Sequence, residues 1–490
     1  MPKALIIGAG IAGIATAIRL AIKGFEVEVF EANNYPGGKL SEIKQNGYRF
    51  DAGPSLLTMP HYIDELFVQV GKSPADYFKY QKLDIICKYF YEDGTKLTAW
   101  ADRQKFIAEL ARVTGEPVEN IIKCIDNSGN IYRLTHKVFL ERSLHRLKTY
   151  IGADALRALL RLPQIDTNRT MHRANESLLK SEKLVQFFDR YATYNGSDPY
   201  QAPATLNVIP HLEQHFGAYF PEGGMYAIAN SLVALAEELG VKFHYGAPVQ
   251  EIIPENKKAT GIKVSNMLIK ADVVISNMDV WFTYRRLLAG HLHLHPKKTL
   301  HQERSSSALI FYWGIKKQFP QLDLHNIFFS ADYKAEFEHI WQKQTIYHDS
   351  TVYLNISSKY KTDHAPEGCE NWFVMINVPA NKGQNWNQLI YEARQNILKK
   401  LSRILNDDIS KLIDGESILD PHSIESRTSS YQGSIYGTSS NRKYSAFLRH
   451  ANQSSKIKNL YFCGGSVHPG GGIPLCLLSA KIVSELIPEP

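Results

Sequence analysis

The chain contains few cysteines, and none of them forms a pair with the spacing of a redox or metal motif. Its 490 residues include five cysteines, and no two of them stand in a CxxC pair. Disulfide frameworks and zinc sites need such pairs or clusters. The cysteine content therefore excludes both and favours a reducing compartment.

Long apolar runs and an extreme net charge are also missing. A membrane-spanning helix needs about 20 mostly apolar residues, and no segment is both that long and poor in glycine. The apolar N-terminal run contains glycines and is followed by Arg19 and Lys23, which argues against a signal peptide. The net charge of +7 is modest for 490 residues and gives no indication of a nucleic-acid partner.

The first motif lies at the N-terminus. A short apolar strand, 4–7, continues into Gly8-x-Gly10-x-x-Gly13, which is the dinucleotide-binding fingerprint. The first glycine makes the turn, the second lets the backbone approach a pyrophosphate, and the third lets the helix pack on the strand. Ile11 and Ala12 lie within this motif, at the helix start that faces the phosphates.

The next strand, 26–30, ends at Glu31. A carboxylate at this position accepts hydrogen bonds from an adenosine ribose and repels a 2′-phosphate, so NADP is disfavoured. A second glycine pair then follows in Gly37-Gly38-Lys39-Leu40. Its N–H groups and the lysine are suited to phosphate, and this addition favours FAD over a nicotinamide.

Two further turns are predicted to approach the flavin ring. One contains Gly53 and Ser55. The other lies in NLYFCGGSVHPGGGIPLCLLS, residues 459–479, which combines a strand, a glycine-rich turn and a helix start. Proline is favoured in the first turn of a helix, so the helix would begin near Pro474 and direct its positive end at an anionic group. The residues expected to contact the cofactor here are Gly464, Gly465, Gly472, Ile473 and Pro474.

These motifs together resemble the bacterial-type carotenoid desaturases, which are FAD flavoproteins of the phytoene desaturase type. The resemblance covers nearly the whole chain and includes RYATYNG at 190–196 and FPEGGM at 220–225. The segment FDAGPSLLTMP, 50–60, is closest to the branch that acts on 1-hydroxylated carotenoids, the 3,4-desaturases. The resemblance implies that Val249 meets the adenine side, and it places Asn277 in the same cofactor domain.

The resemblance also implies an α/β fold similar to that of amine oxidases. A Rossmann-type FAD-binding domain, 1–70, 223–279 and 441–490, would be interleaved with a substrate and membrane-associating domain, 71–222 and 280–440. Four segments of the latter are rich in aromatic and β-branched residues, which predicts strands of a mostly antiparallel sheet. These segments are 309–314, 327–330, 352–356 and 372–378.

The implied activity is FAD-dependent carotenoid desaturation by hydride transfer to the flavin. The substrate would be a 1-hydroxylated acyclic or monocyclic carotenoid, oxidised at the 3,4 bond. Phytoene desaturase is the alternative, and a flavin-dependent isomerase or a non-enzymatic prenyl-lipid-binding protein is more remote. Because there is no second GxGxxG motif, an external acceptor, quinone or oxygen, would reoxidise the flavin.

The side chains offer weaker candidates for catalysis. His468 lies in the C-terminal turn and could serve as a base, or it could hold the loop by a hydrogen bond. Tyr191 and Tyr194 could line an apolar tunnel or be ordinary core aromatics. His291, His293 and His295 alternate but lack acidic neighbours, so we expect an exposed segment and no metal site.

The segment 131–162 is basic and has leucines at near-helical spacing. A basic amphipathic helix of this kind is typical of membrane-surface attachment, although a solvated helix that packs its leucines inwards has the same pattern. A forty-carbon polyene gains roughly 0.8 kcal/mol per methylene on leaving water, so the substrate must come from a bilayer. We therefore predict peripheral, monotopic association on the cytoplasmic side.

Overall fold

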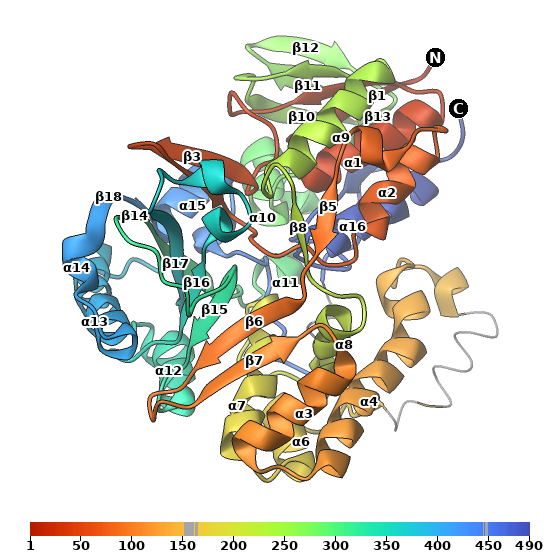
Figure 1. The fold of residues 1–490 in the computed structure, drawn as a ribbon. Helices are drawn as coiled ribbons and strands as arrows, with labels where there is room; N and C mark the ends of the chain where they lie inside the picture. The colour runs from red at the N-terminus through yellow and green to blue at the C-terminus, as the bar shows by residue number, and fades with distance from the viewer. Residues whose placement is uncertain (151–160, 162–164, 444, 446–448) are drawn as a thin grey trace.

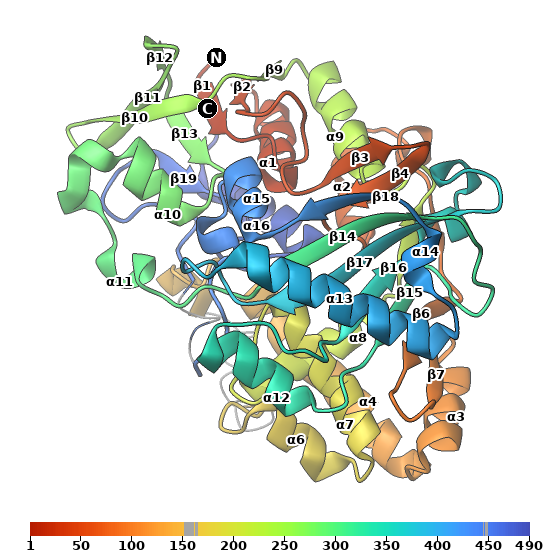
Figure 2. The same ribbon diagram turned by 90° about the vertical axis from the view of Figure 1, so that its left-hand side faces the viewer.

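The computed structural model describes residues 1–150, 161, 165–443, 445 and 449–490 of the chain. Two large sheets form its framework, with helices packed around both (Figure 1). The two termini lie close together in both views (Figures 1 and 2).

The first sheet is parallel and has the strand order β19-β13-β1-β2-β9. Its central strand, β1, is buried from Ala4 to Ile7, as expected for a parallel strand covered on both faces. The strands predicted at 4–7 and 26–30 are confirmed. The bounds are β1 (Lys3–Ile7), β2 (Glu26–Phe30), β9 (Lys242–His244), β13 (Val273–Ser276) and β19 (Leu460–Phe462).

Three helices pack together beside this sheet. The central one, α1, contacts both of the others, α9 and α16, because its buried Ala12, Ala15 and Ala17 are small. A fourth helix, α2, contacts α1 and α16. The bounds are α1 (Ile11–Ile22), α2 (His61–Val68), α9 (Ala227–Glu238) and α16 (Ile473–Leu486). A three-stranded antiparallel sheet packs against β13 of the first sheet, with β10 (Val249–Glu255), β11 (Lys258–Val264) and β12 (Met267–Lys270).

The second sheet has seven strands in the order β18-β14-β17-β16-β15-β6-β7. All neighbours are antiparallel except β15 and β6, so the predicted mostly antiparallel sheet and its four strands are confirmed. The bounds are β6 (Ile85–Phe90), β7 (Lys96–Trp100), β14 (Ser307–Ile315), β15 (His325–Phe328), β16 (Val352–Asn355), β17 (Glu370–Val378) and β18 (Ile413–Leu419).

The second sheet is covered on both faces. Helix α13 (Trp386–Leu405) lies across one face (Figure 2) and packs its apolar side on Trp313 and Val374. The hairpin of β3 (Ser41–Gln45) and β4 (Tyr48–Ala52) places Phe50 against Tyr312. All nine residues of β14 are therefore buried.

The first sheet takes its strands from the segments predicted to bind the nucleotide. The second sheet takes its strands from the segments predicted to form the substrate domain. The division into domains itself stays a prediction.

A group of helices lies beyond the edge of the second sheet, next to β7 (Figure 1). It consists of α3 (Arg103–Thr114), α4 (Val118–Thr135), α6 (Met171–Leu178), α7 (Glu182–Asp189) and α8 (Ile209–Gln214). The remaining named elements are β5 (Tyr80–Lys82), β8 (Tyr219–Pro221), α10 (Val280–Phe282), α11 (Lys297–Leu300), α12 (Tyr333–Glu338), α14 (Ile409–Leu412) and α15 (Pro421–Thr428).

The basic segment is not one continuous helix over its described part. Helix α4 ends at Thr135, a π-helical turn follows to Leu140, and a 3-10 turn spans Leu147–Tyr150. Side chains close the loop between them, since Thr149 Oγ1 donates to Ser143 O at 2.5 Å. The helical spacing therefore mispredicted the local structure, and residues 151–160 and 162 of the segment lie outside the described residues. Within the described part of the chain, no helix combines the length and apolar character needed to cross a bilayer.

Candidate active site

A cavity of about 690 Å³ lies at the carboxyl ends of the parallel strands and extends along the second sheet. Ligands of open α/β sheets bind at this edge of the strands. The cavity brings together His468 and all but one of the residues predicted from sequence to bind the cofactor. Those that line it are Gly8, Gly10, Ile11, Ala12, Glu31, Gly37, Gly38, Lys39, Leu40, Gly53, Ser55, Val249, Asn277, Gly464, Gly465, His468, Gly472, Ile473 and Pro474.

Gly13 is the exception, and its position explains why. It lies in the first turn of α1 and faces the loop at Gly8, where an added Cβ would come within 2.2 Å of the Gly8 carbonyl oxygen. The glycine therefore permits close packing of helix and strand, as the fingerprint predicts. Its contribution to the site is to bring the start of α1 close to the cavity wall.

Glu31 follows the last residue of β2 and is buried. One carboxylate oxygen accepts the Ala9 N–H at 2.7 Å, and the other accepts the Asn33 N–H at 2.9 Å. The second oxygen also accepts Asn33 Nδ2 at 2.9 Å, so the lone pair that can still accept a hydroxyl is on the first oxygen. The carboxylate is therefore held rigidly at the cavity wall with remaining acceptor capacity, which fits a ribose.

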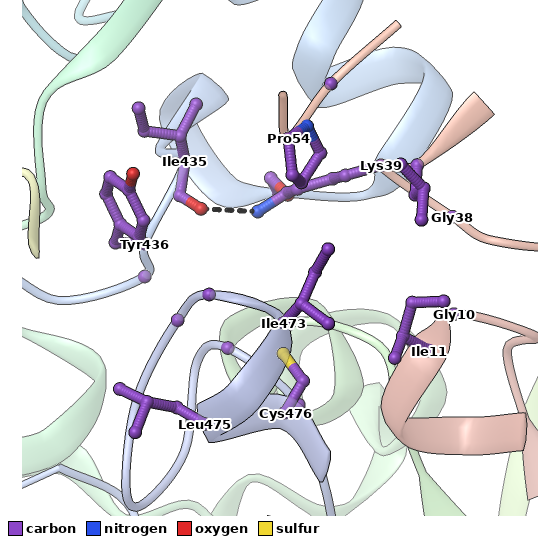
Figure 3. A pocket seen from close by; sticks show the side chains of 18 of the residues that line it. Gly10, Ile11, Gly38, Lys39, Pro54, Ile435, Tyr436, Ile473, Leu475 and Cys476 are labelled. Carbon is purple, nitrogen blue, oxygen red and sulfur yellow. Dashed lines mark hydrogen bonds between the residues drawn. The ribbon is translucent and has the colours of Figure 1, made fainter. Parts of the chain in front are cut away.

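The second glycine pair carries Lys39 across the cavity (Figure 3). Its ammonium group donates to the Ile435 carbonyl at 3.0 Å and to the Ser434 carbonyl at 3.3 Å. Burial lowers the pKa of Lys39 to about 8, although the Asp279 carboxylate opposes this shift. With this pKa, most Lys39 side chains are protonated at neutral pH. Because the residue is only partly covered in the cavity wall, a bound anion could reach this charge.

The C-terminal turn forms the opposite wall of the cavity (Figure 3). Helix α16 begins at Ile473 with Pro474 in its first turn, and no side chain caps it, so its first N–H groups remain available. Gly472 precedes it with a φ of 106°, and an added Cβ would meet nothing within 4 Å. A side chain there would be strained and would project into the cavity, whereas glycine leaves backbone for a flat ring to lie against.

Asn277 and Asn452 hold this turn in place. Asn277 follows β13 and donates through Nδ2 to the Cys463 carbonyl at 3.1 Å. The buried Asn452 donates to the carbonyl of His468 at 2.7 Å and to Ser479 Oγ at 3.1 Å. The glycine-rich turn is thus tied to the sheet on one side and to α16 on the other.

His468 is almost completely buried, and its Nε2 donates to the Arg142 carbonyl at 2.9 Å. Burial lowers its pKa to about 4, so the ring is neutral at physiological pH. These contacts support the loop-holding alternative, because they use the ring to tie the C-terminal turn to the segment after α4. A role as base stays a prediction.

The structure also shows cavity residues that sequence analysis did not single out. Arg449 is 2% exposed and donates to the carbonyls of Tyr436, at 2.9 Å, and Gly465, at 3.3 Å. Burial and the charge of Arg304 lower its pKa to about 10. No motif surrounds this arginine, so only the fold shows that its charge lies in the cavity wall.

Tyr194 lines the cavity, whereas Tyr191 lies in the buried cluster behind it. Tyr194 therefore fits the tunnel-lining alternative, and Tyr191 fits the alternative of an ordinary core aromatic. Among the alternating histidines, His293 is exposed but His295 is buried, with Nε2 bonded to the Leu288 carbonyl at 3.0 Å. The expected exposed segment is wrong at His295, because a 3-10 turn replaces the extended chain. Among the described residues, no group of three His, Cys, Asp or Glu side chains is placed to hold a metal.

The chain belongs to the family described as flavin containing amine oxidoreductases, whose sequence model matches residues 11–488. It is therefore an oxidoreductase with FAD as its cofactor.

Individual relatives refine this assignment. The chain is 52% identical over 489 residues to a 1-hydroxycarotenoid 3,4-desaturase of Flavobacterium sp. (strain P99-3), covering 100% of this chain and 99% of that protein. It is 34% identical to a 4,4'-diapolycopene oxygenase of Methylomonas sp, covering 99% and 98%. The resemblance to carotenoid desaturases is thereby confirmed.

A solved oxidoreductase from Methanosarcina mazei shares the fold, with a TM-score of 0.64 at 17% identity over 99% of this chain and 100% of that one. The amine oxidase-like α/β architecture predicted from sequence is therefore confirmed.

The residues of the cavity fit FAD. The start of α1 has no side-chain cap, which leaves N–H groups for a pyrophosphate, and Glu31 lies where the ribose would be held. The uncapped start of α16 would stabilise negative charge at the ring end. Bound FAD supplies the oxidised ring that accepts a hydride from substrate carbon.

Replacing Glu31 with Gln should weaken FAD binding by about 1 to 3 kcal/mol, because one charged acceptor is lost. The dissociation constant is measured by titrating the apoprotein with FAD. Glu26→Gln is the matched control, since Glu26 begins the same strand and faces Lys242 at 3.3 Å outside the cavity. Equal losses in both variants, or an equal fall in apoprotein Tm, would refute a specific role for Glu31.

The affinity of the apoprotein for FAD should fall as pH rises through about 8, where Lys39 loses its proton. The protonated ammonium attracts phosphate and the neutral amine does not, so the loss approaches about tenfold per pH unit above that pKa. Titrations across this range should be flat over the same window for Lys39→Met. A pH dependence that survives in this variant would assign the effect to another group.

Proposed function

We propose that the protein introduces a carbon–carbon double bond into a carotenoid, by 3,4-desaturation of a 1-hydroxylated acyclic or monocyclic substrate. The observation that carries this proposal is the 52% identity, over the full chain, to a relative with that printed activity. The cavity supports it, because beyond the residues that fit FAD its lining becomes apolar. The lining there includes Phe139, Leu140, Leu144, Ile165, Leu206, Ile209 and Leu212.

In this reaction the chain positions the substrate, excludes water from the cavity and supplies positive charge beside the flavin. Apolar walls exclude water from the polyene and leave it to be held by shape. The positive end of α16 and the buried charge of Arg449 lie where negative charge would develop. The division into an FAD-binding domain, 1–70, 223–279 and 441–490, and a substrate domain, 71–222 and 280–440, is part of the proposal.

A membrane surface is the proposed source of the substrate. Phe139, Leu140 and Leu144 of the basic segment line the cavity. The cations around them, Arg133, Lys137, Arg142 and Arg146, are exposed. This arrangement would place an apolar entrance beside anionic headgroups, so attachment does not require the continuous helix expected from sequence. Peripheral association on the cytoplasmic side is part of this proposal.

An external acceptor, a quinone or oxygen, is proposed to reoxidise the flavin. The sequence has a single dinucleotide fingerprint, and the FAD-type cavity uses it. A quinone would share the membrane with the carotenoid, which favours it as the partner.

Under anaerobic conditions, a 1-hydroxylated carotenoid supplied in vesicles should bleach the visible absorbance of the holoenzyme flavin. A quinone analogue should then restore the absorbance, and chromatography should show a product with one more double bond in conjugation. Bleaching by phytoene alone would support the phytoene desaturase alternative. Isomerised pigment without bleaching would support an isomerase, and a purified protein without flavin would support a lipid-binding role.

Reversing the four exposed cations to glutamate (R133E, K137E, R142E, R146E) should abolish sedimentation with anionic vesicles at low salt. Each basic residue near such a surface contributes about 1 kcal/mol, so the affinity should fall at least about a hundredfold. The matched control is K257E, K258E, K270E and K334E, which reverses four exposed lysines that do not line the cavity. Unchanged sedimentation of the first variant, or equal loss in both, would contradict docking through this segment.

A further inference from the structure

A group of polar side chains interrupts the apolar part of the cavity. Six residues, here called the polar chamber, line the cavity and come from five different elements or loops. They are Ser55, Arg190, Tyr194, Glu213, His325 and Tyr353. Buried polar groups cost free energy unless they are paired, so their presence beside a hydrocarbon-binding wall requires a reason.

One half of the chamber is a buried ion pair. Arg190 is 5% exposed and Glu213 is 2% exposed, and an Arg190 Nη2 donates to Glu213 Oε1 at 3.3 Å. Tyr191 and Tyr194 also donate to the Glu213 carboxylate. The carboxylate is well supplied with donors, whereas the buried Nε of Arg190 has no hydrogen-bond partner in the described part of the structure.

The other half is a hydrogen-bonded chain that begins beside the predicted flavin-facing turn. Ser55 Oγ lies 2.7 Å from Tyr353 OH, and that hydroxyl lies 2.8 Å from His325 Nδ1. Asn355 Nδ2 lies 3.1 Å from the same ring nitrogen. An amide nitrogen can only donate, so with this amide orientation Nδ1 accepts and the proton of the neutral ring is on Nε2.

His325 is neutral because burial and the nearby charge of Arg190 lower its pKa to about 3. Its Nε2 is buried and, among the described residues, has no hydrogen-bond partner. The chamber therefore presents two unpartnered buried donors, His325 Nε2–H and Arg190 Nε–H. Since Glu213 already balances the charge of Arg190, the chemistry favours a neutral oxygen as the acceptor rather than an anion.

We propose that the polar chamber binds the oxygen of the substrate's tertiary hydroxyl, with His325 Nε2–H as a donor, and thereby selects hydroxylated over hydrocarbon chain ends. This inference rests on the proposed function and names the residue that determines its specificity. The position is suitable, because only two carbon–carbon bonds separate C1, which carries the hydroxyl, from C3. The binding group must therefore lie near the reacting bond, and Ser55 connects the chamber to the turn at Gly53.

The test compares the wild-type holoenzyme with His325→Phe, in which the ring remains but both nitrogens are lost. Substrates are a 1-hydroxylated carotenoid and the analogue with hydrogen in place of the hydroxyl, both in the same vesicles. The readout is the ratio of kcat/KM for the two. The matched control is Ile327→Ala, because Ile327 lines the cavity on the same face of β15, two residues along, and carries no polar group.

We expect a strong preference of the wild type for the hydroxylated substrate, since sites built to bind a hydroxyl reject analogues that lack it. His325→Phe should reduce the ratio at least about tenfold, mainly through the hydroxylated substrate. Ile327→Ala should affect both substrates alike. An unchanged ratio in His325→Phe, with both substrates still reducing the flavin, would overturn this inference and leave the proposed function intact.

A second measurement uses the wild type alone and so does not depend on the folding of a variant. With the flavin held reduced by dithionite, so that no turnover occurs, binding is measured for the hydroxylated carotenoid, its 1-methoxy derivative and the hydrocarbon. The methoxy oxygen can still accept, so it should retain part of the preference over the hydrocarbon. Equal binding of all three would show that the chamber holds only water and would overturn the inference. Failure of every carotenoid to bleach oxidised flavin would instead refute the proposed function.

Discussion

The site depends on the close approach of three loops at the carboxyl ends of β1, β13 and β19. Asn277 joins them: its backbone N–H donates to the Ile7 carbonyl at 2.8 Å, and its side chain donates to the Cys463 carbonyl at 3.1 Å. Its Oδ1 lies where an added Cβ on Gly10 would come within 2.5 Å. Since backbone from distant parts of the chain meets here without intervening side chains, N–H groups and helix ends can face one ligand.

The charged side chains of the cavity lie on the same side as these backbone N–H groups and helix ends. Lys39 and Arg449 bring a half-buried and a buried cation to the side where anionic parts of FAD would lie, while Asp279 in the cavity wall pairs with Arg304. Further along, the Arg190–Glu213 pair balances its own charge inside an apolar wall. The cavity thus changes from a cationic cradle to an apolar tunnel with one neutral polar chamber, an order that suits a cofactor at one end and a functionalised polyene at the other.

Much of the fold and of the cavity lining was predictable, because glycine motifs act locally. Gly13, Glu31 and Gly472 each have a role set by neighbours in sequence: a strand that ends, a turn, a helix that begins. Prediction failed where side chains bond to backbone carbonyl groups outside the regular helix or strand pattern. The basic segment has helical spacing, yet contacts such as that of Thr149 with Ser143 and of His468 with Arg142 bend it into a loop. His295 is buried for a similar reason, since a short turn encloses it.

The sequence by itself determined the class of cofactor, the two kinds of sheet and the family, because turn geometry and strand periodicity are encoded over a few residues. Tertiary structure alone brought Arg449 to the cavity wall and assembled the six residues of the polar chamber, which are Ser55, Arg190, Tyr194, Glu213, His325 and Tyr353. The residues of the chamber are separated by up to 298 positions in the sequence, as between Ser55 and Tyr353. No local pattern marks Glu213, His325 or Tyr353, since their chemistry arises only when folding removes water from around the polar groups of the chamber.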